Sequence, residues 1–170
     1  GPIQILPKLR ANLYLLYDTK RLYKLLSGKV SYAYADKEYV YFALHYQPER
    51  TTLPEGGAFV DQLKAIRILR DLLPSNIDIV VKHHPRQFDL YDTRKGHLLR
   101  NYLKREIYSL DRLDGVSLVM PETDSDSLIN SAMGVATVTG TTGWDAIKKG
   151  VPSIVFGDAW YRDCSACLHV

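Results

Sequence analysis

The chain of 170 residues has few of the features that would set it apart from ordinary globular proteins. It has only two cysteines, which excludes a disulfide framework and makes a reducing compartment the expected environment. No apolar run approaches the roughly 20 residues of a membrane-spanning helix, and no secretory signal is visible. The net charge of +3 is too small to argue for nucleic acid as a partner. We therefore expect a globular protein of the cytoplasm.

The two cysteines, Cys164 and Cys167, form a single C-x-x-C pattern close to the end of the chain. Such a pair can be a redox centre, or half of a zinc site with His169 as a third ligand. Redox pairs open a helix near the start of a thioredoxin-like unit, however, and no second pair completes a zinc site. We expect neither a metal nor a cofactor.

The first part of the chain differs in composition from the rest. Gly1-Pro2 is typical of the remnant of a cleaved tag, and residues 3–38 are expected to form a helix (6–27) and a tyrosine-rich connector. Residues 8–29 carry a net charge of +5. Such a segment, with Leu and Tyr between its charges, could lie on an anionic inner-membrane surface. The favoured alternative is a solvated helix face whose apolar side packs on the core or on a missing domain.

Residues 39–170 alternate between strand and helix patterns. Strands are expected at 39–44, 77–81, 116–119, 135–139 and 153–156, with helices at 58–73, 97–109, 124–132 and 144–149. This alternation predicts an α/β domain, a Rossmann-like parallel sheet with helices on both faces. In such sheets ligands bind at the carboxyl ends of the strands.

The segment Thr139–Gly143 follows an expected strand and leads directly into a helix. The amide groups and dipole of a helix start attract anions, and glycines allow a phosphate to approach the backbone. Thr141, Thr142 and Gly143 are therefore candidates for phosphate binding. Asp145 could accept hydrogen bonds from ribose hydroxyls or merely complement the helix dipole. A capped turn without a ligand is an equal alternative.

His84-Pro85 follows the second expected strand. The proline fixes the turn, which holds the histidine at the edge of the sheet, where it can donate to a phosphate oxygen. Lys82, His83 and Arg86 raise the local positive potential. A surface histidine beside a basic loop is the alternative.

The loop 45–57 follows the first expected strand, and loops of this length are often functional. Its candidate binding residues are His45, Gln47, Glu49, Gly56 and Gly57. The helix after Gly57 is expected to begin without a side-chain cap, which would leave its amides for a ligand. A loop without a ligand is again an equal alternative.

Together these segments resemble the capsule polysaccharide biosynthesis family of bacterial glycosyltransferases, which includes the Kdo transferases. The resemblance covers roughly residues 39–161 and rests on 41–49 with Thr51-Thr52 and Gly56-Gly57, on 81–85, on 138–146 and on 152–161.

The resemblance implies one half of a GT-B fold, the C-terminal domain that binds a nucleotide sugar, with a CMP-linked donor favoured. In the related CMP-sugar transferases, a His-Pro motif and a Ser/Thr pair contact the nucleotide phosphate. These match His84-Pro85 and Thr141-Thr142. An acidic residue that holds the ribose matches Asp145, although the family often has Glu there.

The resemblance also implies partners that this chain does not contain. The catalytic acid or base belongs to a missing N-terminal domain, so the isolated chain is expected to be inactive. The acceptor would be a polysaccharide or glycolipid. GT-B enzymes generally need no bound metal, so none is expected here. The alternatives are a non-catalytic GT-B-like module in polysaccharide assembly or export, and an epimerase-like use of the same fold.

Overall fold

The computed structural model describes residues 5–47, 55–88 and 97–170, and it contains a six-stranded, entirely parallel sheet. The strands lie in the order β3-β2-β1-β4-β5-β6. They are β1 (Tyr39–Ala43), β2 (Asp78–Lys82), β3 (Val116–Val119), β4 (Gly134–Thr137), β5 (Ser153–Val155) and β6 (Cys167–His169). The Rossmann-like prediction is confirmed, and the first five strands lie within two residues of their expected positions.

The sixth strand was not predicted. β6 is three residues long and extends the sheet beyond β5, with Leu168 opposite Ile154. Its side chains are mostly exposed, so the segment lacks the apolar pattern of a buried strand. Cys167 therefore belongs to the edge of the sheet.

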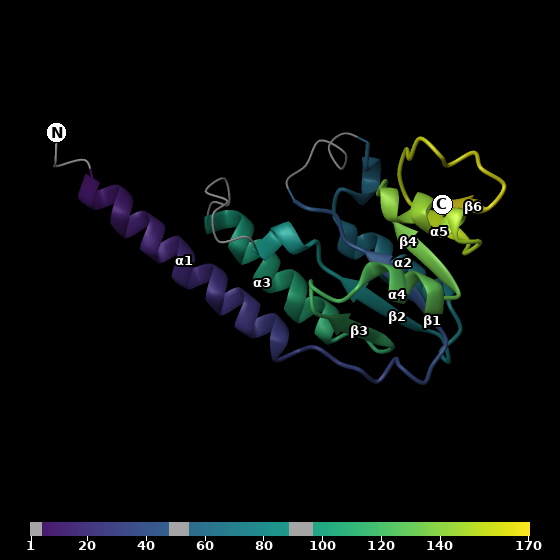
Figure 1. Cartoon of the computed structure of the whole chain (residues 1–170), viewed down its shortest axis with the longest axis horizontal. Helices are drawn as coiled ribbons and strands as arrows, with labels where there is room; N and C mark the ends of the chain where they lie inside the picture. Colours follow the sequence, from purple (N-terminus) through teal and green to yellow (C-terminus); the bar gives the residue numbers. More distant parts are fainter. Residues whose placement is uncertain (1–4, 48–54, 89–96) are drawn as a thin grey trace.

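Helices cover both faces of the sheet (Figure 1). They are α1 (Ile5–Ser27), α2 (Gln62–Leu72), α3 (His97–Asp111), α4 (Ser125–Ser131) and α5 (Thr141–Lys148), with 3-10 turns η2 (Gly57–Phe59) and η3 (Pro85–Phe88). The alternation along β1 separates two apolar cores. Val40 and Phe42 pack with α1, α2 and α3, whereas Tyr39 and Tyr41 pack with α4 and α5.

Helix α1 lies alongside α3, and its N-terminal end projects beyond the rest of the molecule (Figure 1). Leu22 and Leu26 of α1 are buried in the same core as β1 and α2. After the helix, Val30 forms a parallel bridge with Leu118 of β3, and the Ser31 amide donates to the Leu118 carbonyl over 3.0 Å. The C-terminal end of α1 is thus joined to the edge of the sheet.

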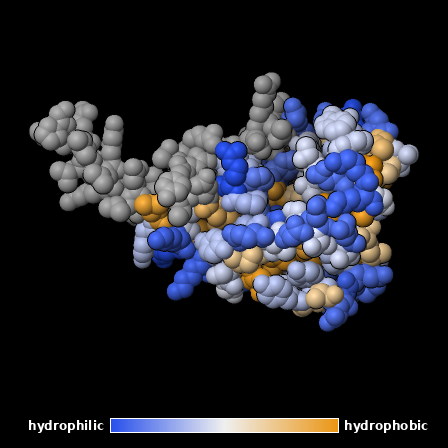
Figure 2. All heavy atoms as spheres, in the orientation of Figure 1, coloured by the Kyte–Doolittle hydropathy of each residue, from blue (hydrophilic) through white to orange (hydrophobic). Residues whose placement is uncertain are grey.

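The face of the molecule in Figure 2 is mostly hydrophilic, with small apolar patches scattered between polar side chains. Patches of this size are normal on a protein surface and do not by themselves mark an interface.

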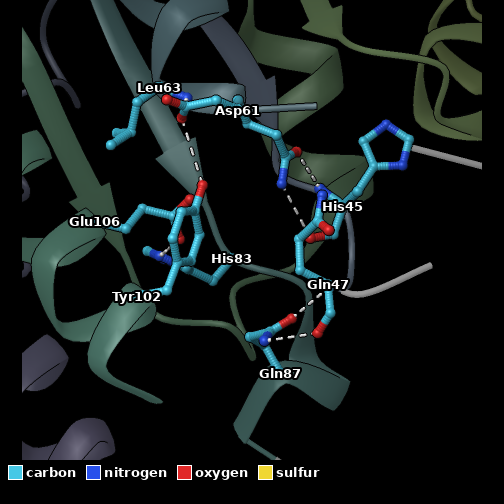
Figure 3. A network of polar contacts seen from close by, with 9 residues as sticks. His45, Gln47, Asp61, Leu63, His83, Gln87, Tyr102 and Glu106 are labelled. Carbon is cyan, nitrogen blue, oxygen red and sulfur yellow. Dashed lines mark hydrogen bonds and ion pairs between the residues drawn. The ribbon is translucent and has the colours of Figure 1, made fainter. Parts of the chain in front are cut away.

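A buried polar cluster lies at the end of β2 (Figure 3). His83, which follows β2, and Glu106 of α3 are almost completely buried. Nε2 of His83 lies 3.3 Å from Oε2 of Glu106. Nearby, the Tyr102 hydroxyl lies 3.4 Å from Oδ1 of Asp61, and burial raises the pKa of Tyr102, which keeps it protonated as a donor. The cluster therefore connects the end of β2 with both α3 and α2.

Asp61 also corrects the prediction of an uncapped helix after Gly57. Helix α2 begins at Gln62, and the Asp61 carboxylate accepts a hydrogen bond of 3.2 Å from the Leu63 amide. The residues directly after Gly56 form only the short turn η2. Aspartate is a strong N-cap, so the helix starts where its first amides find an acceptor.

We expect Leu26→Ala to lower the free energy of unfolding by about 2–5 kcal/mol, because it opens a cavity in the core shared by α1 and the sheet. Urea unfolding followed by circular dichroism measures the change. Tyr17→Ala on the same helix is the matched control, since Tyr17 is 60% exposed and should change stability by less than about 0.5 kcal/mol. Equal effects of the two substitutions would show that α1 is not part of this core.

Glu106→Ala should lower the free energy of unfolding by about 1–3 kcal/mol, because it removes the buried carboxyl group whose Oε2 lies 3.3 Å from His83 Nε2. The exposed Glu38 provides the control variant Glu38→Ala. A double-mutant cycle with His83→Ala isolates the pair, and a coupling energy near zero would contradict the interaction.

Candidate functional site

A pocket of about 340 Å³ lies at the carboxyl edge of the sheet. Its lining comes from the segments after β1, β2 and β4: Ala43, Leu44, His45, Tyr46, His84, Thr137, Thr139, Gly140, Thr141 and Thr142. Chain connections leave β1 and β4 toward opposite faces of the sheet, which opens a crevice between their ends. The structure thus places His45, His84 and the Thr141-Thr142 turn in one pocket.

The start of α5 forms one wall of this pocket. Gly140 is the N-cap and supplies no side-chain cap, and helix geometry gives the first amides no acceptor within the helix. The hydroxyls of Thr141 and Thr142 and the positive end of the helix dipole add to this anion-attracting surface.

Only glycine fits at the turn before α5. A Cβ on Gly140 would lie 2.6 Å from Thr137 Oγ1 and 3.3 Å from the His45 ring. The turn is held by the Gly140 amide, which donates to Thr137 Oγ1 over 3.2 Å, and by the Tyr161 hydroxyl, which donates to the Gly140 carbonyl. Gly140 was not among the candidate residues predicted from the sequence. The close approach of Thr137 and His45 explains why a glycine is needed at this position.

Two predicted residues of α5 lie outside the pocket lining. Gly143 is buried against Tyr161 and Ser153, where a Cβ would collide with both hydroxyls, so it serves packing between α5 and β5. Asp145 is about half exposed and forms an ion pair of 2.8 Å with Lys148. Neither contributes to the pocket wall in this structure.

His84 lines the pocket, and its ring orientation is set by the backbone. The Arg86 amide donates to His84 Nδ1 over 3.2 Å, so the proton of the neutral ring lies on Nε2. Pro85 is exposed and begins η3, which places that amide beside the ring. The Tyr46 ring lies 6.0 Å from the His84 ring and 5.4 Å from the Arg86 guanidinium carbon, so positive charge lies near the pocket.

The side chain of Lys82 points away from the pocket, toward the start of α4. It is buried, and its ammonium group donates to the Thr123 carbonyl and, over 2.7 Å, to the Ser125 hydroxyl at the start of α4. Burial lowers the pKa of Lys82. This side chain fixes the chain before α4 and is not part of the pocket lining.

Two buried glutamines hold the backbone of the loop after β1 (Figure 3). The His45 amide donates to Gln62 Oε1 over 2.7 Å, and Gln62 Nε2 donates to the His45 carbonyl over 3.4 Å. Gln87 makes the same paired contacts with Gln47, at 2.8 and 3.2 Å. Gln47 therefore contacts Gln87 through its backbone, and neither Gln62 nor Gln87 was among the residues predicted from the sequence.

The His45 ring connects this loop to the turn before α5. Its Nε2 accepts a hydrogen bond of 3.0 Å from the Thr139 amide and lies 3.1 Å from the Thr137 hydroxyl. Burial, with a smaller contribution from nearby His84, lowers the pKa of His45 to about 4. The ring is therefore neutral near pH 7.

The remaining loop candidates lie away from the pocket or outside the described residues. Gly57 has a φ of +51°, which favours glycine, and buried Gly56 packs against Gly157 after β5. The Glu55 carbonyl accepts a 3.0 Å hydrogen bond from the Asp158 amide, so this end of the loop is attached to the segment that follows β5. Glu49 lies in the segment 48–54, outside the described residues.

Within the described ranges, no group of three or more His, Cys, Asp or Glu side chains is arranged to hold a metal ion. Cys164 and Cys167 are half-buried free thiols. No helix in the same ranges is both long and apolar enough to cross a bilayer.

Comparisons with known proteins agree with this architecture. The family model described as "Capsule polysaccharide biosynthesis protein" matches residues 53–164. No curated protein sequence matches the chain significantly. Among solved structures, the KpsC β-Kdo 2,7 transferase of Thermosulfurimonas dismutans is similar with a TM-score of 0.55 and 18% identity, over 92% of this chain and 46% of that one.

Two further structures show the same fold. The KpsC β-Kdo 2,4 transferase of T. dismutans has a TM-score of 0.53 and 19% identity, over 92% of this chain and 49% of that one. The UDP-GlcNAc 2-epimerase of Methanocaldococcus jannaschii has a TM-score of 0.54 and 15% identity, over 89% of this chain and 38% of that one. The chain thus spans less than half the length of these structures. Because the family model matches about two thirds of the sequence, the chain belongs to the capsule polysaccharide biosynthesis family.

Proposed function

We propose that the chain is the nucleotide-sugar-binding domain of a glycosyltransferase acting in capsule or surface polysaccharide biosynthesis, with a CMP-linked donor. One observation carries the proposal: His84, the two threonines and the uncapped start of α5 line a single pocket at the crevice between β1 and β4. The ends of parallel strands at such a crevice are the usual ligand site of this fold class.

The groups around the pocket suit a phosphate. His84 carries its proton on Nε2 and can donate to a phosphate oxygen, since its Nδ1 is engaged by the Arg86 amide. The amides and dipole at the start of α5 favour the same negative charge. When the sugar leaves, negative charge grows on the phosphate, and donors already fixed in place stabilise it.

The rest of the active site would come from a second domain. The chain covers 46% and 49% of the two Kdo transferase structures, and a pocket of about 340 Å³ is at the lower end for a small-molecule site. A second domain would close this pocket, bind the polysaccharide or glycolipid acceptor and supply the catalytic acid or base. The isolated chain should then bind a nucleotide without transferring a sugar.

The fold comparisons do not separate CMP from UDP, because transferase and epimerase structures match almost equally well. The preference for CMP rests on the position of His84-Pro85 after β2, opposite the Thr141-Thr142 turn. Stronger binding of UDP would favour the epimerase-like use of the fold, and binding of neither nucleotide would favour a non-catalytic module.

His84→Ala should weaken CMP binding by about 1.5–3 kcal/mol, because it removes a hydrogen bond to a charged phosphate. Isothermal titration of CMP and UDP into the wild type and the variant measures this. His169→Ala, an exposed histidine on β6, is the matched control and should bind like the wild type. Equal CMP affinity of the wild type and His84→Ala would show that His84 is not part of the site. Sugar transfer by this chain alone would contradict the proposal that a second domain completes the active site.

We also propose a cytoplasmic location with contact to the inner membrane through α1. Lys20, Arg21 and Lys24 are exposed on this helix, as is Tyr17 beside Arg21. Vesicles containing anionic lipid should retain the protein more than neutral vesicles do, and the triple variant Lys20→Gln, Arg21→Gln, Lys24→Gln should lose the difference. Equal retention on both vesicle types would exclude the membrane contact.

A further inference from the structure

We propose that His45 binds the nucleotide phosphate through its Nδ1–H group, as a neutral donor in a fixed tautomer. This inference rests on the proposed function and assigns one residue of the pocket a specific chemical role. It differs from the role of His84, which also lines the pocket and would donate from its Nε2.

Helix α2 holds the backbone of His45 in place. Gln62, which is buried at the first position of that helix, exchanges two hydrogen bonds with the His45 amide and carbonyl. The side chain therefore starts from a defined position, and little conformational entropy remains to be lost when a ligand binds.

The ring has only one tautomer compatible with its contacts. A backbone amide can only donate, so the Thr139 amide requires an unprotonated Nε2 on His45. A neutral imidazole then carries its proton on Nδ1. The Thr137 hydroxyl also lies against Nε2, and it can donate either to that nitrogen or to the Ala43 carbonyl, 3.3 Å away.

The surroundings keep the ring neutral. Among the described residues, the groups packed around it include Gln62 from α2, Thr137 and Thr139 from the end of β4, and His84 from the turn after β2. Burial, with a smaller contribution from the nearby His84, lowers the pKa of His45 to about 4. Above about pH 4 the ring is therefore neutral, and its Nδ1–H group is a donor in a fixed tautomer.

Nδ1 is the polar atom of His45 that the described residues do not use. The ring lines the pocket, its Nε2 is engaged by the turn before α5, and no contact of the described chain involves Nδ1. A phosphate held at the start of α5 would lie next to this turn. It would accept from Nδ1–H and from the first helix amides together.

Two amide substitutions separate the two ring nitrogens. In His45→Gln the side-chain oxygen can reach the position of Nε2 and accept from the Thr139 amide, but nothing donates at the position of Nδ1. In His45→Asn the shorter side chain places its NH₂ group near Nδ1, while the acceptor for Thr139 is lost. The first variant tests ligand binding and the second tests the structural role.

We expect His45→Gln to keep a melting temperature close to that of the wild type and to bind CMP about tenfold more weakly or worse. His45→Asn should melt about 2–8 °C lower and retain most of the CMP affinity. The opposite pattern, with CMP affinity lost only in His45→Asn, would show that His45 acts through the turn and not on the ligand. Unchanged affinity in His45→Gln, with His84→Ala impaired, would overturn this inference and leave the proposed function standing.

The tautomer can be measured without any nucleotide. In two-bond ¹H–¹⁵N correlation spectra of the ¹⁵N-histidine-labelled protein, His45 should show an unprotonated Nε2 and should remain neutral at pH 5.5. A protonated Nε2, or titration of His45 near pH 6.5, would overturn the proposal. Absence of CMP and UDP binding to the wild type would overturn it together with the proposed function, even if the tautomer were as expected.

Discussion

The chain leaving β1 turns away from the sheet while it is still buried, so its backbone groups need hydrogen-bond partners other than a neighbouring strand. Gln62 and Gln87 supply them, each with one donor and one acceptor. A side-chain amide is the natural group for this task because it carries the same donor and acceptor as a peptide. With this loop fixed, the His45 ring can reach the end of β4.

The pocket is formed because the His45 ring contacts the end of β4. The ends of β1 and β4 are adjacent in the sheet, but the chain leaves them toward opposite faces. The hydrogen bond from the Thr139 amide to His45 joins the two segments at the floor of the crevice, and Gly140 allows them to come this close. His83, the residue before His84, lies with its Nε2 3.3 Å from Oε2 of Glu106, which links the end of β2 to α3.

Much of this arrangement could be predicted from the sequence. Apolar strands separated by amphipathic helices determine a parallel sheet, and the positions of His84 and Thr141 after their strands place both at one edge. The short β6 could not be predicted, because its stability comes from pairing with β5 and its side chains are exposed. The clamping glutamines could not be predicted either, because glutamine is mostly exposed in proteins and the burial of Gln62 and Gln87 is visible only in the structure.

The direction in which each residue faces explains the other differences. Lys82 and Gly143 lie near the pocket in sequence, but each faces a neighbouring element instead: Lys82 the start of α4, and Gly143 the Tyr161 ring. Asp145 lies on the exposed side of α5, where Lys148 neutralises it. Which face a residue presents depends on packing between elements distant in sequence, and local patterns do not contain that information.

The central claim is that a nucleotide phosphate binds at the start of α5 between the ends of β1 and β4. A titration of CMP into the ¹⁵N-labelled protein, followed by amide correlation spectra, tests it directly. The account predicts that the largest shifts fall on the amides of Thr139, Thr141 and Thr142, while those of β6 and of the C-terminal turn of α3 stay unchanged. Shifts concentrated anywhere other than this turn would contradict it.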